Sequence, residues 1–124
     1  MSLNINGWFD VPRKDLVLSA GDNNDIEAFE HMILIPVAPG TRVTGFVPPQ
    51  TGTTWVMSVS NGGAEDIVFP HNDAGSTEGF RTLMPPGFSQ YTLSLGQTVY
   101  FAFTFNADNP AIQGWYPVIP GVIS

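Results

Sequence analysis

TVYFAFTF, at residues 98–105, alternates bulky apolar side chains with smaller or more polar ones. The bulky side chains are Val99, Phe101, Phe103 and Phe105. Side chains on a β-strand point alternately to its two faces, so this pattern predicts a strand with one buried face. The row of phenylalanines is expected to lie in the core of the domain.

Shorter runs of the same kind occupy much of the chain. Residues 54–60 place Trp55, Met57 and Val59 on one face, which we expect to be the core face. Further strands are expected at residues 16–20, 31–36, 42–46, 66–70, 90–95 and 115–118. The chain has 13 Gly and 11 Pro, and turn-forming residues separate the runs. About eight short strands predict an all-β domain, an antiparallel β-sandwich of the jelly-roll type. The alternative for residues 25–32 is a single helical turn, and we find no internal repeat.

The two ends of the chain differ from the middle. We expect an N-terminal arm at residues 1–14, a β-sandwich domain at 15–118 and a C-terminal tail at 119–124. Apolar residues in the two ends are Leu3, Ile5, Trp8 and Phe9, and Val118, Ile119, Val122 and Ile123. Either both ends fold back on their own domain, or they are extended arms that lie on a neighbouring subunit.

Composition and charge exclude several classes of protein. Asp and Glu number 11 against 4 Lys and Arg, which gives a net charge of -7. Nucleic acids and anionic membrane surfaces are bound mainly through Lys and Arg, so we expect neither as a partner. The absence of Cys excludes disulfides and thiolate catalysis. The first residues lack the pattern of a signal peptide, and no apolar stretch is long enough for a membrane helix.

The residues that could support catalysis or metal binding are few and scattered. His31 and His71 do not form the closely spaced histidine pair of a cupin-type metal site. Asp22, Asn24, Asp25 and Glu27 lack the spacing of a calcium-binding loop and are interpreted as a turn. Glu65 and Asp66 are adjacent, so they would point to opposite faces of a strand. We therefore expect a protein that is not an enzyme and holds no metal or cofactor.

The order of the strand and turn segments resembles a small β domain of tailed-bacteriophage virion proteins. The segments are LVLSAGDNND (16–25), TRVTGFVPPQTGTTWVMSVSN (41–61), DIVFPHNDAGSTEGFR (66–81), YTLSLGQTVYFAFTF (91–105) and GWYPV (114–118). The resemblance covers about residues 15–118 and includes head decoration (cement), head-fibre and tail-fibre proteins. It implies a virion component without catalytic residues, in which His71, Asn72, Asp73 and Arg81 order a loop. The proline pairs at 48–49 and 85–86 depart from its usual polar loops.

The resemblance and the apolar ends together predict a capsid decoration protein. It would sit as a homotrimer on the outer surface of the phage head and bridge neighbouring major capsid proteins. The expected contact residues are Leu3, Ile5, Trp8, Phe9, Val118, Ile119, Val122 and Ile123 in the arms, and Tyr100, Ala102 and Trp115 at the trimer contact. The alternative is a tail- or fibre-associated module that binds a host-surface glycan through exposed aromatic residues such as Trp115. A cupin-like metalloprotein is the rival among enzymes.

Overall fold

The chain folds almost entirely as β-strands in the computed structural model, which describes residues 2–3, 9–10, 13–50, 52–118 and 122–124. The strands are β1 (Ser2–Leu3), β2 (Phe9–Asp10), β3 (Arg13–Val17), β4 (Asp22–Asn23), β5 (Ile26–Glu27), β6 (His31–Ile35), β7 (Thr41–Val43), β8 (Phe46–Val47), β9 (Trp55–Asn61), β10 (Ile67–Pro70), β11 (Gln90–Leu93), β12 (Thr98–Thr104), β13 (Gly114–Pro117) and β14 (Val122–Ile123). A single 3-10 turn, Pro110–Ile112, precedes β13 within the described ranges. Among the same residues, no helix is long and apolar enough to cross a membrane.

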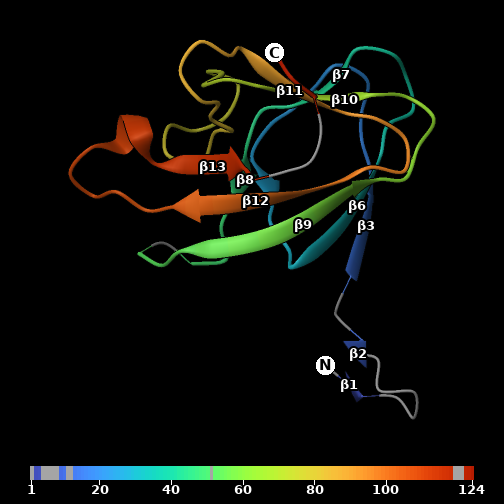
Figure 1. The fold of residues 1–124 in the computed structure, drawn as a ribbon, viewed down its shortest axis with the longest axis horizontal. Helices are drawn as coiled ribbons and strands as arrows, with labels where there is room; N and C mark the ends of the chain where they lie inside the picture. The colour runs from blue at the N-terminus through green and yellow to red at the C-terminus, as the bar shows by residue number, and fades with distance from the viewer. Residues whose placement is uncertain (1, 4–8, 11–12, 51, 119–121) are drawn as a thin grey trace.

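Two five-stranded sheets pack face to face, which confirms the all-β sandwich (Figure 1). One sheet has the order β14-β11-β10-β7-β4, and the other has the order β13-β12-β9-β6-β3. The short pair β5-β8 forms a further small sheet. The region weighed as a helical turn contains β5 and the start of β6, so that alternative was wrong.

Strand pairing in the first half of the domain is parallel, whereas the sequence analysis expected antiparallel pairing throughout. β3, β6 and β9 are parallel neighbours in one sheet, and β4, β7 and β10 are parallel neighbours in the other. β5 and β8 are also parallel. From β3 to β9 the chain moves to another sheet after each strand, so it winds as a coil and returns to each sheet in the same direction. Gly21 and Gly40, with φ angles of 80° and 76°, form corresponding corners before β4 and β7.

The second half of the domain closes this coil with antiparallel strands. β11 pairs antiparallel with β10, and β12 pairs antiparallel with β9. β13 and β14 then form the outer strands beside β12 and β11. The expected jelly roll is therefore replaced by a mixed sandwich, in which a parallel coil is followed by antiparallel strands.

The core is a cluster of aromatic rings supplied by both large sheets and by β8. Phe69 of β10 and Phe101 of β12 face each other across the sandwich with ring centroids 4.9 Å apart. Phe46 of β8 packs against Phe101 at 5.7 Å and edge-on against Trp115 at 5.8 Å. All of these side chains are 0% exposed. The expected inward row is confirmed for Val99, Phe101 and Phe103, but β12 ends at Thr104 and Phe105 is 39% exposed.

Candidate functional site

The described residues of the N-terminal arm before β3 form a two-stranded pair of their own. β1 and β2 pair antiparallel, with Leu3 opposite Phe9. Neither strand joins a five-stranded sheet, and Figure 1 places the hairpin beyond the start of β3, outside the sandwich. Ile5 and Trp8 lie outside the described residues. The described arm positions are therefore placed where a neighbouring protein can reach them.

The end of the C-terminal tail belongs to its own domain. Val122 and Ile123 form β14, which pairs with Tyr91 and Thr92 of β11. The Ser124 amide donates to the Gln90 carbonyl at 2.9 Å. The expectation of an extended C-terminal arm is therefore wrong for residues 122–124, because the open edge of β11 binds them as a further strand. Ile119 lies outside the described residues, and Val118 is 50% exposed.

The three expected trimer-contact residues lie in different surroundings. Tyr100 and Ala102 are on the outer face of β12, where Tyr100 is 47% exposed and Ala102 is half-buried. Trp115 is 0% exposed, and its Nε1 donates to the Phe46 carbonyl at 2.7 Å. Its ring has no exposed surface beside Tyr100 and Ala102, so its assignment to the trimer contact was wrong. Its register opposite Phe103 turns the indole into the core.

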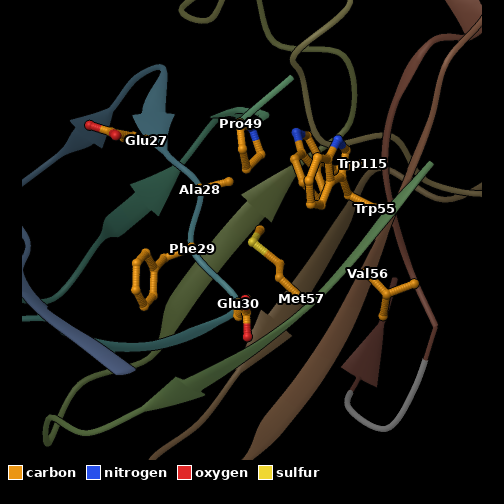
Figure 2. A pocket seen from close by; sticks show the side chains of 9 residues that line it. All are labelled: Glu27, Ala28, Phe29, Glu30, Pro49, Trp55, Val56, Met57 and Trp115. Carbon is orange, nitrogen blue, oxygen red and sulfur yellow. The ribbon is translucent and has the colours of Figure 1, made fainter. Parts of the chain in front are cut away.

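A groove that was not predicted from the sequence lies beside the beginning of β9. It has a volume of about 390 Å³, and Figure 2 shows its lining side chains. Its residues are Glu27, Ala28, Phe29, Glu30, Pro49, Trp55, Val56, Met57 and Trp115. Alternation along β9 assigned Trp55 to the core, but its indole is only partly buried and lines this opening. Its Nε1 donates to the Gln50 carbonyl at 2.8 Å, which fixes the ring at the groove wall.

The loop from His71 to Arg81 is held by side-chain hydrogen bonds. The Met84 amide donates to His71 Nδ1 at 2.8 Å, so this nitrogen is an acceptor. Arg81 Nη1 donates to Asn72 Oδ1 at 3.1 Å, and Arg81 Nε donates to the Ser76 carbonyl at 2.9 Å. These contacts agree with the loop-ordering role that the resemblance implies for His71, Asn72 and Arg81.

Arg42 joins this loop to the acidic turn near residue 22. Its Nη1 donates to Asp22 Oδ1 at 2.7 Å, and its Nη2 donates to Asp73 Oδ2 at 2.8 Å. The Gly75 amide also donates to Asp73 at 2.8 Å. The Gly75 hydrogen bond, and after it the Arg42 guanidinium, lower the pKa of Asp73 below its usual 3.8. Asp73 therefore stabilises the folded chain as a carboxylate.

In Asp73→Asn, the free energy of unfolding should depend less strongly on pH in the acid range. The pKa of Asp73 is lower in the folded chain than in the unfolded one, so the unfolded chain takes up the proton first as the pH falls. Its contribution to stability is present above about pH 4, and it is lost as the pH falls through the folded-state pKa. Urea unfolding between pH 2 and about pH 5 measures this dependence. An unchanged pH dependence in the variant would show that Asp73 has no part in it.

Asp25 and Asn24 of the same turn accept hydrogen bonds from other parts of the chain. Asp25, at φ 47°, accepts hydrogen bonds from the Thr77 amide and hydroxyl at 2.9 and 2.8 Å. Asn24 Oδ1 accepts from the buried Thr44 hydroxyl at 2.6 Å. Within the described ranges, no group of three or more His, Asp and Glu residues is arranged to hold a metal ion. This turn therefore connects two loops through hydrogen bonds.

His31 and Ser58 are in contact across the neighbouring strands β6 and β9. His31 Nδ1 and Ser58 Oγ share a hydrogen bond, and the Ser58 amide donates to the Glu30 carbonyl at 3.0 Å. A serine nucleophile must be reached by its substrate beside oxyanion-binding donors. Ser58 is 7% exposed in the middle of a strand, and its own amide is already paired. We interpret the pair as a contact between strands rather than as a nucleophile and its base.

Comparison with known proteins gives no relative: no protein-family model, no curated protein and no solved structure matches the chain.

Proposed function

We propose that the protein is a non-enzymatic capsid decoration protein on the outer surface of a bacteriophage head. The observation that carries the proposal is the N-terminal hairpin, which pairs within itself and joins neither large sheet. A rigid sandwich with a separate apolar arm suits a protein that bridges neighbours in a lattice. The resemblance to phage virion β domains suggests that this lattice is the shell of a phage head.

The surface of the sandwich supports a passive binding role. The outer face of the β12 sheet carries mainly neutral residues, among them Val56, Tyr100 and Ala102. A neutral face can be buried against another protein without the cost of removing charges from water. A decoration protein that binds only the expanded shell stabilises that shell by mass action. Many weak contacts repeated over a symmetric head then act together.

The glycan-binding alternative loses the residue on which it was based. Trp115 is buried in the core and donates its indole N–H to Phe46, so it offers no surface for a sugar ring. Trp55 lines a groove whose floor and walls are mainly apolar, and Glu27 and Glu30 are its only charged residues in the part of the chain that the structure describes. The decoration proposal is therefore favoured over glycan recognition.

Co-sedimentation with phage heads tests the proposed function. The purified chain is mixed with unexpanded and expanded heads assembled from the major capsid protein of the same genome. We expect saturable binding to expanded heads and much weaker binding to unexpanded heads. Absence of binding to both forms would overturn the proposal. A position on the tail of intact virions, seen by immunogold labelling, would favour the tail-fibre alternative instead.

A further inference from the structure

The first three residues of β9 extend beyond the point where β6 starts to pair with it. This leaves one edge of these three residues open. His31 of β6 pairs with Ser58, whereas β12 pairs with β9 from Trp55 onward. Trp55, Val56 and Met57 therefore have a strand on one side only, among the strands that the structure describes. The Glu30 carbonyl still accepts the Ser58 amide at 3.0 Å. Residues 27–29 line the groove opposite the start of β9 (Figure 2).

The groove combines this open strand edge with an apolar interior. Ala28, Met57 and Trp115 are buried beneath it, and Phe29 and Trp55 form its walls. A shallower depression continues from it along β9 to Ser58 and Tyr100, because both hollows share Glu30, Trp55, Val56 and Met57. The result is an elongated site beside a strand rather than a round cavity.

An elongated apolar groove along an open strand edge fits an extended peptide segment. Such a segment adds as a further strand: its backbone pairs with the open edge, and alternate side chains enter the apolar hollow. The exposed rim residues Glu27 and Glu30 add negative charge at the entrance. The best occupant is therefore an extended, apolar segment with basic residues next to it.

We propose that this groove receives residues 1–12 of a second copy of the chain, the part of the N-terminal arm that precedes β3. The arm carries Leu3, Ile5, Trp8 and Phe9, and two of the four cationic residues, Arg13 and Lys14, follow it directly. Both of these cations are exposed, where they can approach the acidic rim. The single chain leaves the groove open and places the β1-β2 hairpin outside the sandwich, so the two parts are complementary but not joined.

The proposed contact joins unlike surfaces, an arm on one copy and a groove on the next. Contacts of this kind are head-to-tail and close into a ring when the rotation between copies allows it. Docking as a single strand requires the pairing of β1 with β2 to open. Once open, 12 extended residues span about 40 Å, at about 3.3 Å per residue, which is enough to cross to an adjacent domain. The inference deepens the arm contact of the proposed function by naming its receiver. It requires only copies of this chain, so it can fail or succeed without any phage head.

Disulfide trapping between two differently tagged copies tests the proposal directly. The chain has no Cys, so every thiol is one that has been introduced. One copy carries Phe9→Cys in the arm, and the other carries Val56→Cys at the groove. A disulfide needs Cα atoms within about 7 Å, so only a docked arm forms the mixed dimer efficiently. We expect a mixed-dimer yield about tenfold above that of the control, the ratio that 1.4 kcal/mol of preference produces.

Leu95→Cys in place of Val56→Cys is the matched control. Leu95 is 64% exposed and Val56 is 62% exposed, so the two thiols are equally accessible. Leu95 lies at the other end of β9, where the Gly96 amide donates to the Asn61 carbonyl. Equal yields from both positions would mean random collision and would overturn the proposal. A chain carrying both Phe9→Cys and Val56→Cys that closes on itself at high dilution would show that the arm occupies its own groove, which also overturns it.

Sedimentation of uncrosslinked protein gives a second measurement. Val56→Lys places a positive charge beside Glu30, where it opposes the approach of Arg13 and Lys14, and it should weaken self-association by about tenfold or more. Leu95→Lys adds the same charge at the opposite end of β9 and should leave self-association unchanged. A chain that remains monomeric at high concentration, or two variants that behave alike, would contradict the arm-in-groove contact.

Discussion

Phe101→Ala should lower the free energy of unfolding by about 3–5 kcal/mol, enough to remove much of the stability of a small domain. Phe101 is 0% exposed, and its ring lies within 6.4 Å of the rings of Phe46, Phe69 and Tyr91. Its loss removes apolar contacts and leaves a cavity between the two sheets. Urea unfolding followed by tryptophan fluorescence measures the change.

Tyr100→Ala is the control for this prediction, because it deletes a neighbouring aromatic ring of the same strand. Tyr100 is 47% exposed on the outer face of β12, so its loss should cost about 1 kcal/mol or less. The comparison separates packing in the core from the strand propensity of aromatic residues. Similar losses from both variants would show that Phe101 does not organise the core.

The core face of β12 could be predicted from sequence because alternation directly determines which side chains point inward. Val99, Phe101 and Phe103 follow this rule and are buried. The same rule says nothing about the direction of a neighbouring strand. β9 pairs parallel with β6 on one side and antiparallel with β12 on the other. The alternation of side chains along β9 is the same whichever way a neighbouring strand runs. The parallel coil was therefore missed.

The site depends on where strands end, which alternation does not reveal. Trp55 and Met57 share the inward face of β9, but β6 begins only opposite Ser58. Trp55 therefore lies at the groove, where β6 does not extend beside β9. Trp115 shows the opposite error, because it was expected at a trimer contact and is buried. β8 closes that side of the core, and the ring of Phe46 covers the indole.

Gly45→Ala should cost about 3 kcal/mol of stability, although it adds only one methyl group. Gly45 is buried between β7 and β8 and pairs with Arg81 in an isolated bridge. An added Cβ would clash with the Phe80 carbonyl oxygen, and it would lie 2.7 Å from Ser76 Oγ. Neither atom can yield easily, because Phe80 O accepts the Phe46 amide and Ser76 Oγ accepts the Asp25 amide, both at 2.9 Å.

Gly40→Ala is the control that isolates this crowding. Gly40 has a positive φ of 76° but nothing within 4 Å of an added Cβ, so only backbone strain of about 1 kcal/mol is expected. At Gly45 the displaced segment would also pull on Arg81, whose carbonyl accepts the Trp115 amide at 2.9 Å. Near-ultraviolet circular dichroism should therefore change for Gly45→Ala and not for Gly40→Ala, because Trp115 is held in the core. Equal losses of stability in urea unfolding would mean that the contact with Phe80 is not the constraint at Gly45.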